Sequence, residues 1–409
     1  MGAMPASPRQ RIGVDEAMRL ILECMPRWPA VRVPLADAVG AVLRESIVAE
    51  RDQPPFDRVT MDGIAVAGKA FLAGRRQFRV VGTQGAGAAA LRLGGDDHCI
   101  EVMTGSVLPA GADTIIPVER VTRAGDEARI EAGYAAGAGQ FIHRHGSDHA
   151  RGDTLLGPGT LIGPAEMAIL TIGGHADVAV TRWPRISVVA TGDELVDAGH
   201  PIAEFQIRSS NDRAIGAALQ RRGHPHVARA TLRDDPQALR REIGRLHESS
   251  DLLILSGGVS MGQFDHVPKT LADLGVQVVF HKITQRPGMP MWFGQDADGK
   301  VVFALPGNPV SSLVCLVRYV VPGLEAAMGA SPRPRARVRL GEAVEFKPDL
   351  TYFLPVILAW SDNGDATAQP KPTNTSGDFV SLGGTDGFVE LPRGQEHFPA
   401  GFPALFFNW

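Results

Sequence analysis

Three loops in the second half of the chain combine glycine with hydroxyl, amide or carboxylate side chains. They cover residues 191–194, 256–260 and 306–309, and each follows directly on a short apolar segment. If those segments are parallel strands of an open sheet, the loops meet at its carboxyl edge, where ligands bind. Glycine lets backbone amides approach an anion, and the start of a following helix adds its dipole. The loops predict a site for a phosphate-bearing ligand; the alternative is that they are tight turns only.

Acidic side chains occur at the same expected edge. Glu194 lies in the first loop, and Asp265 follows the second. Carboxylates beside bound phosphates usually hold Mg²⁺, a hard cation that prefers oxygen ligands. We therefore favour a cation site for Glu194 and Asp265 over solvated loop charge. Asp235 stands before a proline, which is more typical of a helix N-cap.

Two polar segments lie outside these loops. Residues 54–63 contain two prolines and an Asp-Gly pair, which would form a rigid loop with Asp62 outward; a plain turn is the stronger interpretation. Residues 143–153 are rich in histidine and acid, but their spacing matches no tetrahedral metal motif. We expect a solvated loop or a patch for anions there. The side chains concerned are His143, Arg144, His145, Asp148, His149 and Asp153.

Several classes of protein are disfavoured. The chain has no GxxxxGK[ST] motif and no GxGxxG after an apolar segment, which argues against an ordinary P-loop NTPase or Rossmann dehydrogenase. Its 41 basic and 45 acidic residues give a net charge of −4, and only 6% of residues are aromatic, so we expect no nucleic-acid surface. The three cysteines stand far apart, which fits a reducing compartment. We expect a cytoplasmic protein with no membrane span and no signal peptide.

The elements that would position the loops form an alternating pattern. Three helical segments, 211–222, 236–247 and 267–274, alternate with apolar segments at 186–190, 227–232, 252–255, 276–280 and 301–305. Alternation of this kind predicts a parallel sheet with helices on both faces.

The whole chain of 409 residues is long enough for about two to four domains. We expect a multi-domain α/β plus β protein with four parts. The parts are an N-terminal helical and connector domain (1–50 and 140–182), a small β domain (51–139), the α/β domain (183–328) and a C-terminal β domain (329–409). Within the first part we expect helices near residues 14–22, 35–45 and 164–172.

Five signatures together resemble those of the molybdopterin molybdenumtransferases, molybdate insertases related to the E domain of gephyrin. They span most of the chain in the order and spacing of that family. The signatures are Pro-Pro-Phe-Asp with Met-Asp-Gly (54–63), Met-Thr-Gly with Pro-Ala-Gly-Ala-Asp (103–113), Thr-Gly-Asp-Glu-Leu (191–195), Ser-Gly-Gly-Val-Ser (256–260) and Leu-Pro-Gly-Asn-Pro-Val-Ser (305–311).

The resemblance implies an elongated four-domain homodimer whose α/β domain is similar to molybdopterin adenylyltransferase. The implied active site lies between that domain of one subunit and the β domain of the other. The implied transferase reaction takes molybdate and adenylylated molybdopterin, requires a divalent cation such as Mg²⁺, and yields molybdenum cofactor and AMP. Contacts with molybdopterin adenylyltransferase and with molybdoenzymes are the implied protein partnerships.

By the same match, individual residues receive expected roles. Asp62, Glu194 and Asp265 would be catalytic, and Asp62, Thr104 and Asp148 would reach in from the partner subunit. The cation would be held by Glu194, Asp234 and Asp265. The residues implied in binding the substrates are Thr104, Asp148, Thr191, Ser256, Gly257, Gly258, Ser260, Arg286, Pro306, Gly307, Asn308 and Ser311.

The chain departs from the family at the expected oxyanion site. Where the family usually has Lys-Pro-Gly-Lys-Pro, this chain has Arg286 first and Met289 in place of the second lysine, and a family arginine aligns with Pro355. Loss of one such charged hydrogen bond costs on the order of 1.5–3 kcal/mol. An acidic residue of many relatives is also missing beside Arg208.

Two functional interpretations follow. The first is a working insertase with a rearranged oxyanion site. The alternative is a divergent paralogue that binds molybdopterin nucleotide or cofactor without efficient insertion. The candidates for replacement charge are Arg286, Arg208, His143 and Arg144.

Overall fold

The computed structural model describes residues 9–259 and 266–409, and the chain forms two compact units. The first unit takes in the described parts of Met1–Glu45, Pro158–Ala165 and Asp177–Trp409. The second consists of Ser46–Gly157 and Glu166–Ala176. Helix α3 (Pro164–Ile172) contributes residues to both units.

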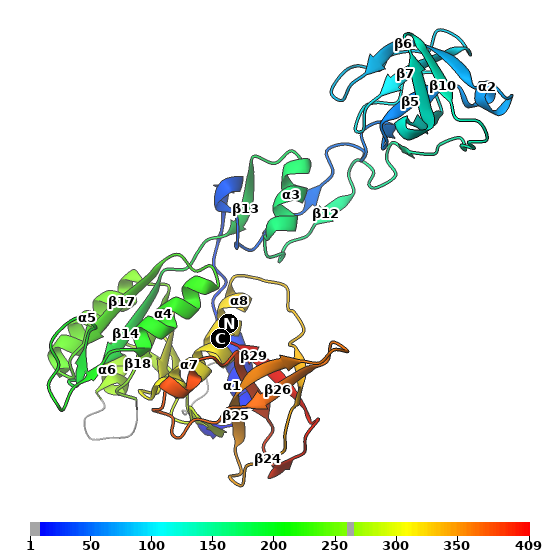
Figure 1. Ribbon diagram of the computed structural model, residues 1–409. Helices are drawn as coiled ribbons and strands as arrows, with labels where there is room; N and C mark the ends of the chain where they lie inside the picture. The colour runs from blue at the N-terminus through cyan, green and yellow to red at the C-terminus, as the bar shows by residue number, and fades with distance from the viewer. Residues whose placement is uncertain (1–8, 260–265) are drawn as a thin grey trace. The chain divides into compact units, whose positions relative to one another are not determined.

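A seven-stranded sheet forms the centre of the first unit (Figure 1). Its order is β1 (Arg9–Ile12), β19 (Gln277–Ile283), β21 (Trp292–Gln295), β22 (Val301–Leu305), β18 (Leu252–Ser256), β14 (Ile186–Thr191) and β17 (Val227–Leu232). The last four strands run parallel, as the alternating pattern predicts. Every residue of β14, β18 and β22 is buried, because helices cover both faces of the sheet.

Two sets of helices cover this sheet. Side chains of α4 (Asn211–Arg221) and α7 (Pro309–Cys315) pack with Val188 on one face. Side chains of α5 (Pro236–Ser249) and α6 (Val267–Asp273) pack with Val189 on the other. Neighbouring residues of a strand point to opposite faces, so a continuous apolar strand packs against the helices on both faces of the sheet.

The structure differs from the sequence predictions in two elements. The sheet is not purely parallel, because β21 runs antiparallel between β19 and β22. The helix expected over residues 35–45 is wrong: only one 3₁₀ turn, Leu35–Asp37, forms there. Gly40 has a φ of +78° soon after that turn, and Val42 and Leu43 then make isolated β-bridges. The apolar residues of this segment therefore belong to irregular extended chain, not to one face of a helix.

A buried helical segment leads from the sheet to the C-terminal domain. Helix α7 continues through a π-helical turn (Leu316–Val320) into α8 (Val321–Ala327), which packs with α1 (Val14–Cys24) in the core. Pro309–Ala327 is the one helix among the described residues that is long and apolar enough to cross a membrane, and 78% of its apolar window is buried. The core helix of a globular domain has these properties.

The C-terminal strands close into a five-stranded ring. Its members are β25 (Thr351–Trp360), β26 (Ala366–Pro370), β23 (Arg337–Leu340), β29 (Pro403–Asn408) and β27 (Gly387–Leu391), which pairs back with β25. A short strand from the α/β domain, β20 (Gln285–Arg286), joins β25 in parallel. A second short pair consists of β24 (Val344–Glu345) and β28 (His397–Phe398), which run antiparallel. Strand β20 thereby carries Arg286 onto the C-terminal domain.

The second unit is built on a six-stranded sheet. Its order is β8 (Thr114–Pro117), β5 (Gly63–Val66), β7 (His98–Val102), β6 (Gln77–Gln84), β10 (Glu127–Ile130) and β9 (Val121–Ala124). Helix α2 (Gly68–Leu72) packs on it. Three two-stranded pairs complete the connecting regions of the chain: β4 (Arg58–Val59) with β11 (Ile142–His143), β3 (Ile47–Val48) with β12 (Thr154–Leu156), and β2 (Ala30–Pro34) with β13 (Asp177–Thr181).

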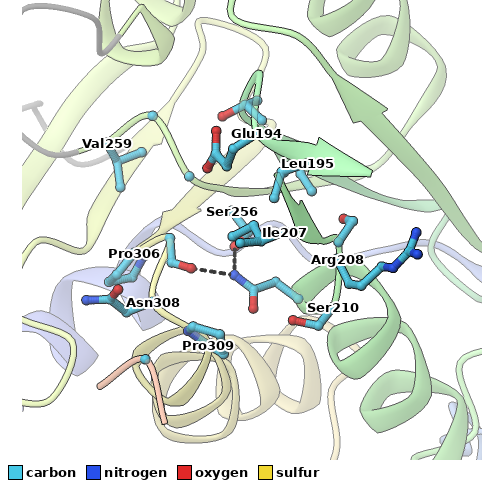
Figure 2. A pocket seen from close by; sticks show the side chains of 18 of the residues that line it. Glu194, Leu195, Ile207, Arg208, Ser210, Ser256, Val259, Pro306, Asn308 and Pro309 are labelled. Carbon is cyan, nitrogen blue, oxygen red and sulfur yellow. Dashed lines mark hydrogen bonds between the residues drawn. The ribbon is translucent and has the colours of Figure 1, made fainter. Parts of the chain in front are cut away.

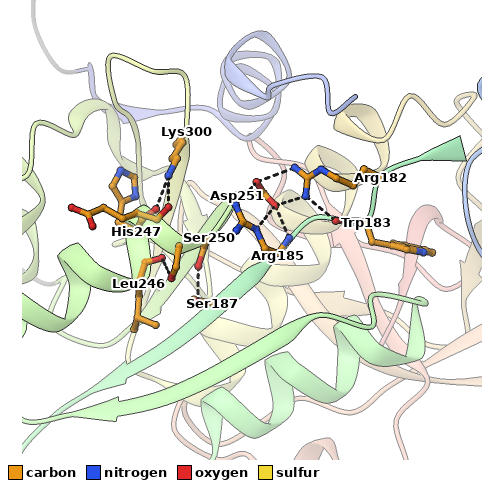
Figure 3. A network of polar contacts seen from close by, with 11 residues as sticks. Arg182, Trp183, Arg185, Ser187, Leu246, His247, Ser250, Asp251 and Lys300 are labelled. Atoms are coloured by element: carbon orange, nitrogen blue, oxygen red, sulfur yellow. Dashed lines mark hydrogen bonds and ion pairs between the residues drawn. The ribbon is translucent and has the colours of Figure 1, made fainter. Parts of the chain in front are cut away.

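A charged cluster fastens the starts of two central strands, at the edge away from the predicted loops (Figure 3). The Asp251 carboxylate accepts from both terminal nitrogens of Arg182 at 2.9 and 3.0 Å, and from the Arg185 backbone at 2.7 Å. Burial alone would raise the pKa of Asp251, but these hydrogen bonds outweigh it and hold the pKa well below its usual range. The cluster therefore serves the fold.

Candidate functional site

The three predicted loops meet at the carboxyl ends of β14, β18 and β22. There they enclose a first pocket of about 580 Å³ (Figure 2). Among its lining residues are nine of the expected site residues: Thr191, Glu194, Asp234, Ser256, Gly257, Gly258, Pro306, Gly307 and Asn308. Because β22, β18 and β14 are adjacent parallel strands, their following loops open on the same side.

Glycine is required in these loops by close packing as well as by backbone conformation. A Cβ atom on Gly257 would lie 2.5 Å from the carbonyl oxygen of Thr191, and the φ of Gly257 is +102°. A Cβ atom on Gly258 would lie 2.7 Å from Cγ2 of Val267. The loop after β18 thus lies directly against the loop after β14, which brings its backbone to the pocket wall.

Asn211 connects two of the three loops, those after β18 and β22, and sequence reasoning did not assign it a role. Its Nδ2 atom donates to Oγ of Ser256 at 2.8 Å and to the carbonyl oxygen of Gly307 at 2.7 Å. Its Oδ1 atom and the hydroxyl of Thr191 are buried with no hydrogen-bond partner among the described residues. Buried polar atoms are nearly always paired, so these two atoms at the pocket are suited to a polar ligand. Asn211 is the first residue of α4, and this position is the signal in the sequence that could have identified it as a site residue.

Two of the three expected cation ligands line the first pocket. These are Glu194 and Asp234. Asp265, and with it Ser260, lies outside the residues that the structure describes. Asp235 is confirmed as the N-cap of α5, since its carboxylate accepts from the Ala238 backbone at 2.7 Å.

A second pocket of about 700 Å³ adjoins the first, and Pro290, Pro306 and Asn308 line both. It lies between the 286–290 turn, the start of α7 and the C-terminal domain. The expected residues Arg286 and Ser311 line it, and so do both departures from the family pattern. The charged residues that line it are Arg286, Glu345 and Lys347, and the residues that differ from the family pattern are Met289 and Pro355. The departures at positions 289 and 355 therefore concern the second pocket, whereas the segment around Arg208, which lacks an acidic residue of many relatives, lines the first.

A buried polar network supports the turn that bears Arg286. Gln285 is fully buried and donates from Nε2 to the carbonyl oxygen of Pro287 at 3.1 Å, while its amide oxygen accepts from the phenol of Tyr319. Tyr319 lies in the π-helical turn, a feature often found at functional sites. The thiol of Cys315 donates to the carbonyl oxygen of Gly288. Burial raises the pKa of both Tyr319 and Cys315, so both stay protonated donors.

Arg208, a candidate for replacement charge, holds a neighbouring loop. Its Nη1 atom donates to the carbonyl oxygens of Asp197 and His200 at 2.9 and 2.7 Å. Figure 2 shows its guanidinium group directed away from Ser256 and Glu194. Arg208 therefore supports the wall of the first pocket.

The remaining expected site residues belong to the second unit. The Asp62 carboxylate accepts from the hydroxyl and the backbone of Thr104 at 2.7 and 2.6 Å, which lowers its pKa. The Asp148 carboxylate lies 2.8 Å from Nε2 of His143. Thr104 is followed by Gly105, whose backbone donates to Val59 of β4, the strand that pairs with His143. The three residues thus occur on neighbouring segments.

The histidine-rich connector forms separate ion pairs. Arg144 binds Asp57 at 2.8 Å, and His145 lies 3.2 Å from Asp52. Among residues 9–259 and 266–409, no three His, Cys, Asp or Glu side chains group as a metal centre. The charged side chains of the connector thus pair with acidic residues of the 52–57 segment.

Comparison with known proteins shows matches along the whole chain. Residues 12–174 match the MoeA N-terminal region (domain I and II), residues 187–326 a probable molybdopterin binding domain, and residues 337–406 the MoeA C-terminal region (domain IV). The chain is 38% identical over 399 residues to a molybdopterin molybdenumtransferase of Synechocystis sp., covering 97% of this chain and 100% of the relative. It is 31% identical to one of Staphylococcus aureus, covering 97% and 96%.

Solved structures give the same result. A molybdopterin biosynthesis MoeA protein of Pyrococcus horikoshii has 30% identity and a TM-score of 0.77, covering 97% of this chain and 99% of the other. A second structure of a MoeA protein from that organism has 26% identity and a TM-score of 0.80, covering 98% and 100%.

Proposed function

The chain belongs to the molybdopterin molybdenumtransferase family, and from this premise we infer that it is a transferase of molybdenum cofactor biosynthesis that inserts molybdate into molybdopterin. The match covers 97% of this chain and 100% of the Synechocystis relative. A divergent paralogue that binds without insertion is therefore not favoured.

The two adjoining pockets support an assignment of the substrates. We place adenylylated molybdopterin in the first pocket, because glycine loops at the carboxyl ends of parallel strands are suited to phosphate. Molybdate, a tetrahedral dianion, would occupy the second pocket beside Arg286 and Ser311. The shared wall of Pro290, Pro306 and Asn308 lets the two substrates meet. This adjacency is the observation that carries the proposal, with AMP as the expected second product.

The first pocket also fits a divalent cation. Glu194 and Asp234 offer the oxygen ligands that Mg²⁺ prefers, and the unpaired Asn211 oxygen is a further oxygen nearby. We propose that Glu194 and Asp234 hold Mg²⁺, with Asp265 as a third expected ligand. Bound there, the cation would neutralise phosphate charge. The glycine loops and Asn211 would orient the nucleotide, and the Thr191 hydroxyl would bind a polar group of the ligand.

We further propose that the active protein is a cytoplasmic homodimer with a shared active site. In this proposal Asp62, Thr104 and Asp148 complete the first pocket of the partner subunit. Asp62 is suited to this role because its carboxylate is exposed and held ionised by Thr104. Contact with molybdopterin adenylyltransferase would supply the substrate, and contact with molybdoenzymes would transfer the product to them.

Mixing two inactive variants tests the shared site. Asp62→Ala and Glu194→Ala should each abolish AMP release from adenylylated molybdopterin. If the site is shared, a heterodimer has one intact site, and a mixture equilibrated for subunit exchange should recover about a quarter of wild-type activity, since half the dimers are mixed and each has one working site of two. A mixture that stays inactive although exchange is shown by differently tagged subunits would contradict the shared site.

A further inference from the structure

Lys347 lines the second pocket together with Arg286, although the two residues are far apart in the sequence. We propose that Lys347 binds the molybdenum oxyanion as the second cation of this pocket, replacing the charges missing at Met289 and Pro355. The inference rests on the proposed placement of molybdate in the second pocket. It assigns a substrate-binding role to a lysine that the motif comparison leaves unassigned.

Strand pairing and an aromatic stack bring the two cations to one place. Arg286 of β20 is the register partner of Tyr352 in β25. The Tyr352 ring stacks on Phe346, with centroids 4.1 Å apart and planes inclined by 6°. Phe346 directly precedes Lys347 in the chain. Arg286 and Lys347 thus flank the same pair of stacked rings.

The segment that carries Lys347 is anchored. Phe346 is 8% exposed, and its backbone donates to the carbonyl oxygen of Glu396 at 2.7 Å. The preceding residues form β24, which pairs with β28. The backbone of Lys347 is therefore held beside the pocket while its side chain remains exposed to a ligand.

The charge balance of the pocket favours an anion. Neither Arg286 nor Lys347 forms an ion pair with a described residue. Glu345 is the one carboxylate among the described lining residues, and it lies 2.6 Å from Nδ1 of His397. Two unpaired cations facing one paired carboxylate leave the pocket positive. Ser311, 3% exposed, adds a hydroxyl at the start of α7.

The chemistry of the two cations is complementary. A guanidinium group such as that of Arg286 presents a planar set of donors to two oxygens of an oxyanion, whereas a lysine ammonium acts as a compact point charge that adapts to the remaining oxygens. A tetrahedral dianion offers oxygens on both sides. The two cations that line the second pocket can therefore bind it together without a residue at position 289 or 355.

The test is the molybdate dependence of AMP release at saturating adenylylated molybdopterin and Mg²⁺. Lys347→Met should raise the apparent KM for molybdate about tenfold or more, as expected for one lost charged hydrogen bond, with little change in the KM for the nucleotide substrate. Lys347→Arg should retain most of the molybdate affinity. The matched control is Lys371→Met, which removes the same charge from a lysine that bonds Gly383 and lines neither pocket.

The outcomes separate this inference from the proposed function. If Arg286→Met raises the KM for molybdate while Lys347→Met does not, Lys347 is excluded and the second pocket stands. If Lys347→Met and Lys371→Met raise the KM for molybdate equally, the change comes from the net charge of the protein and the inference is overturned. If neither Arg286→Met nor Lys347→Met changes it, the placement of molybdate in the second pocket is also wrong.

Discussion

The phenol of Tyr319 donates a hydrogen bond to the amide oxygen of Gln285, the residue immediately before Arg286. Both side chains have 0% exposure. Arg286 therefore belongs to a strand, β20, whose first residue, Gln285, is held by a buried hydrogen bond. Tyr319 reaches Gln285 from the π-helical turn between α7 and α8. We regard Tyr319 and Gln285 as positioning residues for Arg286.

Replacing Tyr319 by phenylalanine tests this positioning. The variant leaves the buried Gln285 oxygen without a partner and should lower the free energy of unfolding by about 1–3 kcal/mol. Because the 286–289 turn loses one of its buried supports, the KM for molybdate should rise while the KM for the nucleotide substrate stays unchanged. Val338→Ala, in the C-terminal core, supplies a control that is destabilised without touching the turn. Equal effects of both variants on molybdate would refute a positioning role.

Gly257 should not tolerate alanine. The new methyl group would lie 2.5 Å from the Thr191 carbonyl oxygen at a φ of +102°. Strain and overpacking together should cost about 3 kcal/mol of stability and weaken nucleotide binding. Gly275→Ala is the matched control, because its φ is also positive, at +82°, but nothing lies within 4 Å of its new Cβ. Urea denaturation should show a clearly smaller loss for Gly275→Ala; equal losses would mean that the loop contact is unimportant.

Buried His224 predicts an acid-sensitive fold. Burial, followed by the charge of Arg222, lowers the pKa of His224 from 6.5 to about 4. The unfolded chain then binds more protons between these two pH values, so stability falls as pH decreases from about 6.5 to 4 and stops falling, for this group, below 4. The full loss is about 3 kcal/mol. The urea midpoint of His224→Leu should depend less on pH over this range.

The control for this experiment is two residues away. His226 is exposed, so His226→Leu should keep the wild-type pH dependence. An unchanged profile in His224→Leu would show that other groups cause any acid sensitivity of the protein.

Glu194 should determine the response to Mg²⁺. Glu194→Gln keeps the shape of the side chain but removes its charge, so the Mg²⁺ concentration for half-maximal AMP release should rise about tenfold, the effect of roughly 1.4 kcal/mol. Glu204→Gln, which changes a carboxylate outside the first pocket, should leave the Mg²⁺ response unchanged. The same Mg²⁺ response in both variants would place the cation elsewhere.

Much of the α/β domain could be predicted because its strands are buried on both faces. The bounds of β17 and β22 agree with the segments expected at 227–232 and 301–305. Continuous apolar runs followed by glycine loops have few alternatives, so the meeting of the three loops was also predictable. The antiparallel β21 was not, since strand direction within a sheet leaves no mark on a four-residue run.

The second pocket shows what sequence spacing could not supply. Arg286 and Ser311 were expected there from their motifs. Lys347 stands in a segment with no motif, and the stacking of the preceding residue, Phe346, on Tyr352 holds that segment beside the pocket. The Gln285–Tyr319 bond likewise depends on a π-helical turn, which shifts side chains relative to α-helical spacing. Both relationships are between distant segments, so only the fold reveals them.

The most direct test of the account is AMP release from adenylylated molybdopterin by the purified protein in the presence of Mg²⁺, measured with and without molybdate. The two adjoining pockets predict release that molybdate stimulates, with formation of molybdenum cofactor. Such a result would mean that the second pocket works with methionine at position 289. Tight binding of the nucleotide with no molybdate-dependent release would contradict insertion as the function of this chain.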